Sequence, residues 1–526
     1  MSSPRNSANS IMRGFKQVGF FTGISRILGL IRDVLFALVL GAGAASDAFL
    51  VALKLPNLFR RITAEGALTN VFLPAYEKEV AEKSEKAALH LVTEVQILLV
   101  ISLSALVVVF ELAMPLIIEI LAPGFKLTTD RFEATIFLAR ITMPYLVMIS
   151  LVALWSALLN THRLFWPGAA APILLNLALI SGAMFVFLTA GSLAETALLS
   201  LTIPLAISVV VAGILQLFLI KIVLVRYRIN PVWRWAGISK AGKKMWHSFV
   251  PAAFSAGSVQ INIFVDMILA SLLPVGAISW LYYSDRITQL PLGIIGIALG
   301  TALLPYLSRL YANGEKMEMG KSLSSSLYLG SFFTLPATVA LILLSPVIIS
   351  GVFGYGAFDY RDVSATASAL VAYAIGLPAF VAQKLFQSVF YASKRPLTVL
   401  KISLVTVVAN IFFSIILMQF LGHIGLALGT SVAIWLGVFF QAYLLSRDDY
   451  LDIKSLLKLL PILCSCLVMG VVLKLLNGWL MATQMLDIYI LIIMVSIGLA
   501  VYFSLAFWSG FLPPGLIRKA SHKQQI

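Results

Sequence analysis

Long apolar runs recur along the whole chain and are separated by short polar segments. A run of about twenty residues is the length that an α-helix needs to cross the hydrocarbon core of a membrane. The runs lack the apolar–polar alternation that marks the strands of a membrane barrel, so helices are predicted. We expect about fourteen transmembrane helices. They are predicted at roughly 18–41, 46–76, 90–120, 131–160, 166–188, 197–223, 245–273, 276–308, 323–350, 364–391, 396–418, 423–445, 455–476 and 486–511.

Composition supports the same class. The chain has 526 residues, of which 60% are hydrophobic and only 12% are charged. A soluble protein would carry roughly a quarter charged residues. Cys464 and Cys466 both lie inside an apolar run, so neither a disulfide nor a metal site is expected there. We therefore predict an all-α polytopic membrane protein with no sizeable soluble domain.

The basic residues are concentrated in alternate loops. The net charge is +15, but segments such as 78–86, 226–244 and 309–321 hold many of the cations, and the loops 189–196 and 477–485 hold none. This is the pattern of loops that stay in the cytoplasm, and it argues against nucleic acid as a partner. Both termini are then predicted to be cytoplasmic, with 1–17 as a polar arm that is not a removed signal peptide. Lys126, Arg131 and Arg361 are exceptions on the outer side.

A faint internal repeat suggests two related halves. Leu73-Pro74 matches Leu304-Pro305, and Pro115 to Ile118 matches Pro346 to Ile349, both at an offset of 231 residues. Asn176 and Asn410 are 234 residues apart. Because the offset spans six predicted helices, the halves would share one orientation in the membrane. Unrelated helix ends could also give such short matches. The predicted organisation is an arm 1–17, a lobe 18–223, a basic linker 224–244, a second lobe 245–445, two further helices 446–511 and a tail 512–526.

Ionisable residues inside apolar helices are the candidate functional groups. Placing a charge there costs several kcal/mol, so such residues normally face a protein interior or a wet cavity. The second lobe supplies Asp266, Asp285 and Arg286. The first two helices supply Arg26, Arg32, Asp33, Asp47, Lys54, Arg60, Arg61 and Glu65. Guanidinium groups bind phosphate in a planar, bidentate way. A cavity lined by these arginines would therefore suit an anion, and a pyrophosphate fits best.

Other interpretations remain open for several of these residues. Arg60 and Arg61 could extend to the surface from a cytoplasmic helix end. Asp33 and Glu65 are better explained as structural partners of arginines than as ligands of a substrate, and we expect Asp33 to pair with an arginine on a neighbouring helix. Lys54 could lock a pair of helices.

A second site could hold a monovalent cation. Asp266 lies in the middle of one helix, Asn410 and Ser414 are one turn apart on another, and Thr430 lies on a third. One carboxylate with amide and hydroxyl oxygens could bind sodium. The alternative is an aspartate hydrogen-bonded to neighbouring helices.

Signatures of catalysis are missing from the sequence. The chain has no G-x-x-x-x-G-K-[ST] loop, and its 5 histidines include no H-x-x-x-H pair. We predict that it is not an enzyme and that it has no cofactor, apart from the candidate sodium ion. Energy would come from an ion gradient, the membrane potential or the gradient of the substrate.

Several motifs together resemble the lipid II flippase family MurJ/MviN. The resemblance runs from about residue 18 to residue 445. The motifs are Ser25 to Asp33, Gly41-Ala42-Gly43, Ser46 to Phe49, Lys54 to Arg61, Ala64 to Ala67, Ala122 to Phe125, Tyr282 to Arg286, Leu290-Pro291 and Gly300 to Pro305.

The resemblance implies a fold, a substrate and roles for individual residues. The fold would be that of the multidrug/oligosaccharidyl-lipid/polysaccharide exporter superfamily, with two six-helix lobes in a V and two extra helices that form a lipid-facing groove. The cavity arginines of the family match Arg26, Arg32, Arg60 and Arg286, and its charged partners match Asp33, Asp47, Lys54 and Glu65. A sodium site found in part of the family resembles Asp266, Asn410 and Thr430, but Ser414 stands where a second carboxylate is expected.

The implied activity is transfer of lipid II, a disaccharide-pentapeptide on undecaprenyl pyrophosphate, across a bacterial cytoplasmic membrane by alternating access. Lys54 would help to bind the substrate, and Asp285 would act with the gating partners. The expected partners are lipid II, membrane lipid and the cell-wall synthesis machinery, and we expect a monomer. Three alternatives remain: a drug exporter, which would need carboxylates in its cavity, an exporter of another undecaprenyl-linked oligosaccharide, and a membrane scaffold that transports nothing.

Overall fold

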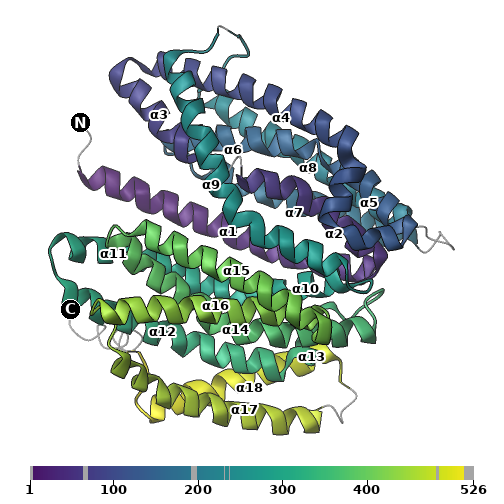
Figure 1. Ribbon diagram of the computed structural model, residues 1–526, viewed down its shortest axis with the longest axis vertical. Helices are drawn as coiled ribbons and strands as arrows, with labels where there is room; N and C mark the ends of the chain where they lie inside the picture. The colour runs from purple at the N-terminus through teal and green to yellow at the C-terminus, as the bar shows by residue number, and fades with distance from the viewer. Residues whose placement is uncertain are drawn as a thin grey trace. The chain divides into compact units, whose positions relative to one another are not determined.

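The computed structural model describes residues 4–62, 69–190, 198–229, 231–235, 237–480 and 485–513. All regular elements in these ranges are helical, which confirms the predicted all-α class (Figure 1). Within the same ranges, ten helical segments are long and apolar enough to cross a membrane. The predicted number of fourteen is not confirmed. Helices α1, α2 and α10, which carry most of the candidate charges, are not among the ten.

The described residues divide into two units, 1–279 and 280–526. In the first unit α1 packs on α7, α7 packs on α8, and α2 packs on α5. Helix α9, which would open the predicted second lobe, packs on α3 and α4 in this unit. The elements of the unit are α1 (Pro4–Leu40), α2 (Ala44–Arg60), α3 (Thr69–Glu82), α4 (Glu85–Leu121), η2 (Pro123–Leu127), α5 (Thr129–Thr142), α6 (Tyr145–Thr161), α7 (Trp166–Ala190), α8 (Leu198–Arg226) and α9 (Lys240–Ser271).

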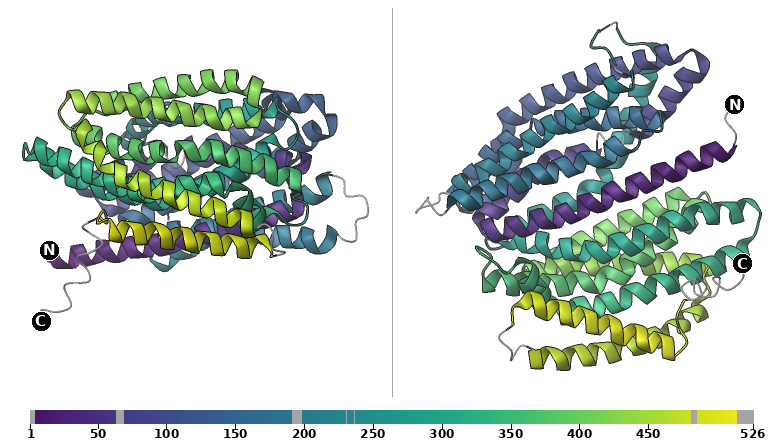
Figure 2. Two further views of the ribbon diagram at one scale, coloured as in Figure 1. Left: turned by 90° about the horizontal axis from the view of Figure 1, so that it is seen from below. Right: turned by 180° about the vertical axis from the view of Figure 1, so that it is seen from behind.

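The second unit is built around α14, which packs against α11, α12, α13 and α16. Helices α17 and α18 lie side by side and contact α12 and α13 (Figures 1 and 2). The unit begins inside α10 (Ala277–Pro291) and continues through η3 (Leu292–Gly296), α11 (Ile297–Ala312), α12 (Lys316–Leu343), α13 (Ser345–Phe353), α14 (Tyr360–Ala392), α15 (Pro396–Leu421), α16 (His423–Arg447), η4 (Ile453–Leu459), α17 (Leu460–Leu480) and α18 (Asp487–Trp508).

Several predicted helices are interrupted at prolines. The predicted helix 131–160 divides at Pro144, 276–308 passes through a short π-helical stretch after Pro291, and 323–350 divides just before Pro346. Proline removes a backbone donor and crowds the preceding turn, which favours a break at these positions, although α4 and α14 run on through Pro115 and Pro378. Long apolar runs alone did not reveal these interruptions. In the opposite direction, α1 already begins at Pro4, so the described part of the predicted polar arm is helical.

Candidate functional site

The candidate charges of the first unit lie on its first two helices. Arg26, Arg32 and Asp33 are on α1, whereas Asp47, Lys54 and Arg60 are on α2. Their surroundings differ: Arg26 is exposed, Lys54 and Arg60 are half-buried, and Arg32, Asp33 and Asp47 are buried. Asp285 and Arg286 lie on α10 in the second unit. The predicted partner Glu65 lies outside the described residues.

Arg32 is the centre of a buried polar network. Its side chain is 9% exposed, and its Nη2 and Nε donate to Oδ1 of Asp33 at 2.7 and 3.0 Å. Its Nη1 donates to Oδ1 of Asn176 on α7 at 3.0 Å, and its guanidinium lies 5.6 Å from the ring centre of Phe36. Asp33 therefore pairs with Arg32 on its own helix, and its expected pairing with an arginine on a neighbouring helix stays a prediction. The guanidinium is therefore held in one orientation by a charged and a neutral acceptor.

Asn176 fixes this network to the backbone of α1. Its Nδ2 donates to the carbonyl oxygen of Ser25 at 2.8 Å and to Oγ of the same serine at 3.4 Å. These bonds orient the amide so that its oxygen faces Arg32. The sequence drew attention to Asn176 only as a marker of the internal repeat. A lone amide in an apolar run was the available signal, because a buried polar side chain needs a partner.

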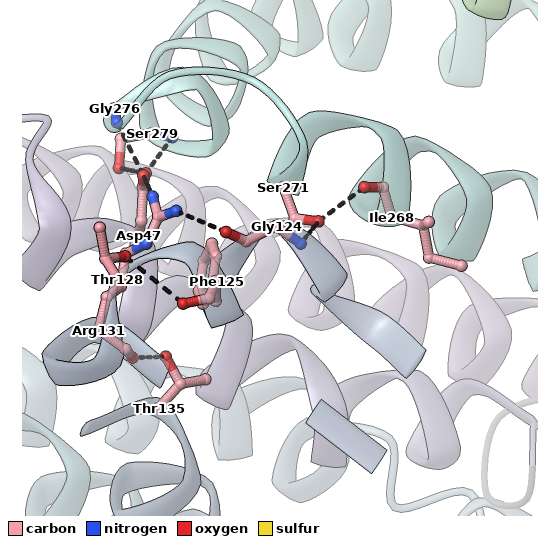
Figure 3. Close-up of polar contacts among 10 residues, drawn as sticks. All are labelled: Asp47, Gly124, Phe125, Thr128, Arg131, Thr135, Ile268, Ser271, Gly276 and Ser279. Atoms are coloured by element: carbon pink, nitrogen blue, oxygen red, sulfur yellow. Dashed lines mark hydrogen bonds and ion pairs between the residues drawn. The ribbon is translucent and has the colours of Figure 1, made fainter. Parts of the chain in front are cut away.

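Asp47 is the centre of a second buried cluster, at the start of α2 (Figure 3). The carboxylate is 1% exposed. Its Oδ1 accepts from the backbone N–H and the Oγ of Ser279, at 3.0 and 2.7 Å. Its Oδ2 accepts from the N–H of Gly276 at 2.8 Å and from Nη1 of Arg131 at 3.4 Å. One side chain therefore connects α2 to the turn between α9 and α10 and to α5.

Arg131 is one of the three exceptions to the charge pattern, and its burial explains the exception. The residue is 4% exposed, and its guanidinium lies 4.0 Å from the ring centre of Phe125. Its Nη2 donates to the carbonyl oxygen of Gly124 at 3.5 Å. Lys126 is explained differently, because it forms an ion pair with Glu119 at 2.5 Å. A cation in an outer loop can therefore be retained for its contacts within the protein, without determining the orientation of the protein in the membrane.

Gly124 lets the η2 turn approach the end of α9 very closely (Figure 3). A Cβ on this glycine would lie 1.9 Å from the carbonyl oxygen of Ser271. The glycine N–H donates to Oγ of Ser271 at 3.3 Å, and this hydroxyl donates to the carbonyl oxygen of Ile268 at 2.7 Å. Contacts of Asp47, Arg131 and Gly124 thus hold both sides of the α9–α10 turn.

In the second unit, Arg286 lies against an aromatic ring. Its Nη2 donates to the hydroxyl of Tyr282 at 3.1 Å, and its guanidinium lies 4.8 Å from the centre of the same ring. The neighbouring Asp285 accepts a hydrogen bond from Gln289. The helix itself is anchored to α14, since Oγ of Ser284 donates to the carbonyl oxygen of Thr366 at 2.8 Å. One face of the guanidinium is therefore covered by a ring, and its donors lie along the edge of its plane, the geometry that binds a phosphate group in a bidentate way.

The candidate sodium ligands lie in both units. Asp266 is on α9, where its Oδ2 accepts from Nδ2 of Asn262 at 3.4 Å. In the second unit Asn410 is buried on α15 and its Oδ1 accepts from Oγ of Ser414 at 3.3 Å. Thr430 on α16 donates to the carbonyl oxygen of Leu426 at 3.2 Å. The cation site stays a prediction.

The chain matches one family model, described as "Lipid II flippase MurJ", over residues 36–498. A relative from Rickettsia prowazekii, named "Probable lipid II flippase MurJ", is 35% identical over 499 residues, which cover 93% of this chain and 96% of the relative. A relative of the same name from Rhizobium tropici is 36% identical over 519 residues, with 97% and 96% covered.

Solved structures agree with this assignment. "Lipid II flippase MurJ, inward closed conformation" has a TM-score of 0.78 at 28% identity and covers 94% of this chain and 99% of that chain. An inward-facing MATE family transporter of the MOP superfamily has a TM-score of 0.65 at 15% identity, with 81% and 94% covered, which shows the shared fold alone. With the match of the family model over most of its length and relatives above 30% identity along nearly the whole chain, this protein belongs to the MurJ family of lipid II flippases.

Proposed function

We propose that this protein moves lipid II from the inner to the outer leaflet of the bacterial cytoplasmic membrane by alternating access. The relatives that carry this activity in their names support the substrate. The physical task is to bring a pyrophosphate and a large polar head group through an apolar slab, where an unpaired charge would cost many kcal/mol. Residues that replace water around the pyrophosphate are therefore the core of the mechanism.

The buried guanidinium of Arg32 is the observation that carries this proposal. A desolvated cation in an apolar helix is costly unless it is paired, and Arg32 is paired with one carboxylate and one amide oxygen. We assign it to the pyrophosphate, together with Arg26, Arg60 and Arg286, and with Lys54 as a further cation. Asp33 competes with the phosphate for the same guanidinium. Binding is then moderate and depends on the state of the transporter, which allows the cargo to leave.

The Asp47 cluster supplies a latch for the outer side. It joins the start of α2 to the α9–α10 turn through Ser279 and Gly276. The segment that holds Lys126 and Arg131 lies at this end of the first unit, and the charge pattern assigns it to the outside. The proposed release step requires the hydrogen bonds between Asp47 and the α9–α10 turn to separate. Asp285 and Glu65 belong to the same set of proposed gating partners.

Energy for the cycle is proposed to come from the membrane potential, with sodium bound by Asp266, Asn410 and Thr430 as a second source. A potential that is negative inside favours the export of negative charge by about 2.3 kcal/mol per charge per 100 mV. Both termini are proposed to lie in the cytoplasm.

The test is reconstitution into vesicles with labelled lipid II and an impermeant probe that reads only the outer leaflet. Arg286→Ala and Arg32→Lys should each abolish or strongly reduce transfer. The first change removes the cation, and the second keeps the charge but loses the bidentate fork of the guanidinium. Arg140→Ala is the matched control, since Arg140 lies on a membrane helix but is 46% exposed and 3.9 Å from Glu111. Wild-type transfer by both site variants would overturn the proposed role of the arginines. Binding of lipid II without transfer by the unmodified chain would favour a scaffold.

A further inference from the structure

An ion pair lies at the surface of the first unit, between α4 and α5, two helices that pack on each other (Figure 1). Nε of Arg140 on α5 is 3.9 Å from Oε2 of Glu111 on α4. The glutamate side chain is 30% exposed and the arginine side chain is 46% exposed. Neither residue belongs to the set assigned to lipid II, so the pair needs an explanation of its own.

The pair lies well inside the part of the helices that would be surrounded by lipid. Both α4 and α5 belong to segments that are long and apolar enough to cross a membrane. On α4, Glu111 is the one ionisable residue between Glu94 and Glu119, and Glu119 lies in the last turn of the helix. Glu111 is eight residues, or about 12 Å along the helix axis, from Glu119. Because the hydrocarbon core is about 30 Å thick, the pair falls within it.

The surface around the pair is apolar. On α4, Val108, Leu112 and Leu116 are exposed and follow one another at intervals of four residues, which places them on one face of the helix. Leu112 directly follows Glu111 in the sequence. On α5, the exposed Phe137 lies one turn before Arg140. A face with these side chains suits contact with acyl chains or with another apolar protein surface, and it does not suit a water-filled channel.

The chain itself does not satisfy the hydrogen-bonding groups of the pair. The contact of 3.9 Å is longer than a hydrogen bond, and among the described residues neither Glu111 nor Arg140 forms one. A guanidinium has five N–H donors, and a carboxylate has two accepting oxygens. Acyl chains offer neither donors nor acceptors, so charged side chains in membrane helices normally face protein or water. The pair therefore calls for a polar partner inside the membrane.

A second copy of the same chain has the charges that this surface requires. Glu111 lies ten residues before the end of α4, and Arg140 lies eleven residues after the start of α5. The two charges are therefore at similar depth, side by side in the plane of the membrane. A two-fold axis along the membrane normal keeps the depth and reverses the order of the two charges. Glu111 of one copy then faces Arg140 of the other, and the reverse contact forms with it.

We propose that two copies of the chain associate through this surface, which consists of Val108, Glu111, Leu112, Phe137 and Arg140. The charges of both copies form one network at its centre, and the apolar side chains around them exclude lipid. This proposal replaces the monomer that the sequence led us to expect. It does not depend on the cargo, and each copy keeps its own complete set of residues assigned to lipid II. Transfer by a single copy is therefore not the quantity to measure.

The test is resonance energy transfer between donor-tagged and acceptor-tagged copies of the full chain in vesicles, followed as added lipid dilutes the protein. The unmodified chain should associate as a dimer. Glu111→Arg and Arg140→Glu should each weaken association by about tenfold, because like charges then face each other across the contact. Lys126→Glu is the matched control, since it reverses an exposed cation that pairs with Glu119 at the end of the same helix. It should change the affinity by less than about twofold.

Mixing the two site variants separates association from folding. Copies with Glu111→Arg present two cations and copies with Arg140→Glu present two anions, so the mixture should associate more tightly than either variant alone. The double variant Glu111→Arg/Arg140→Glu exchanges the charges within one chain and should associate like the unmodified chain, even if the single variants fold poorly. An unmodified chain that stays monomeric at every dilution would overturn the proposal. Equal weakening by Lys126→Glu would overturn it too, as would a mixture and a double variant that both remain monomeric.

Discussion

At the scale of single residues, the two buried carboxylates on α1 and α2 have different tasks. Asp33 contacts a cation that we assign to the substrate, so it can exchange that cation with a phosphate. Asp47 accepts from two backbone N–H groups, one hydroxyl and one guanidinium, which together use its acceptor positions. A carboxylate satisfied in this way is a structural joint and not a ligand.

Asn176→Ala is the sharpest test of the network around Arg32. It removes the neutral acceptor of Nη1 and leaves a buried donor without that partner, which costs about 1–3 kcal/mol. We expect lower thermal stability and reduced transfer of lipid II, measured by a thermal unfolding assay and in vesicles. Asn313→Ala, at an exposed amide that contacts Glu315, should change neither quantity. Unchanged transfer and stability of Asn176→Ala would show that the amide is dispensable.

A double-mutant cycle tests the contact between Asp47 and Arg131. Asp47→Asn and Arg131→Gln should each destabilise the protein, and the double variant should be less damaged than the sum of the two. The coupling expected for a buried charged pair in one network is about 0.5–3 kcal/mol in the free energy of unfolding. The exposed pair of Glu119 and Lys126 is the control, with coupling below about 1 kcal/mol. Additive effects at Asp47 and Arg131 would mean that the two side chains act independently.

At the scale of elements, the α9–α10 turn is held in place because the η2 turn and the start of α2 both lie close to its backbone. The η2 turn touches the last residue of α9 through Gly124, and α2 touches the first turn of α10 through Asp47. The turn at 272–276 is thereby held from two sides. These contacts give the proposed latch its geometry, because small movements of α9 would have to break several hydrogen bonds together.

Gly124→Ala should be strongly destabilising, since its methyl group would lie 1.9 Å from the carbonyl oxygen of Ser271. Overpacking of this kind costs about 1–3 kcal/mol or more. The control is Gly478→Ala, because Gly478 lies inside α17 with nothing within 4 Å of an added Cβ. Alanine there should stabilise the helix by up to about 1 kcal/mol. Thermal unfolding of both variants measures the difference, and a neutral Gly124→Ala would contradict the close approach.

At the scale of the whole molecule, the side predicted to be cytoplasmic carries many cations, six of them in residues 226–244, which contain no carboxylate. Anionic lipids of that leaflet attract such a surface. The same charge distribution concentrates an anionic head group near the protein before it enters. The cations on the predicted cytoplasmic side therefore explain both the orientation of the protein in the membrane and the attraction of anionic lipid head groups to it.

The membrane potential should influence transfer if the cargo crosses with net negative charge. Imposing about 100 mV, negative on the side from which lipid II departs, should favour export by about 2.3 kcal/mol per charge. Initial rates in vesicles with a potassium diffusion potential measure this effect. Reversing the potential should slow transfer, and rates that ignore its sign would show that the charge is neutralised during the step.

The sequence alone determined the class of the protein and the set of costly residues. Apolar runs of membrane length require helices in lipid, whatever their packing. Charges inside those runs, among them Arg32, Asp47 and Arg286, can be identified from the sequence, because an ionisable side chain within an apolar helix costs free energy unless it has a partner. The cytoplasmic preference of the basic loops follows in the same way from local sequence.

Only the tertiary structure decided which of these residues meet. Asn176 lies 144 positions from Arg32, and Ser279 lies 232 positions from Asp47. Periodicity describes the faces of one helix, whereas these contacts depend on how separate helices pack and on where prolines interrupt them. A cavity beside α4, at the start of α9, has the same origin, because the sequence does not distinguish Lys243 from Lys244 and only the structure shows that Lys243 lines it.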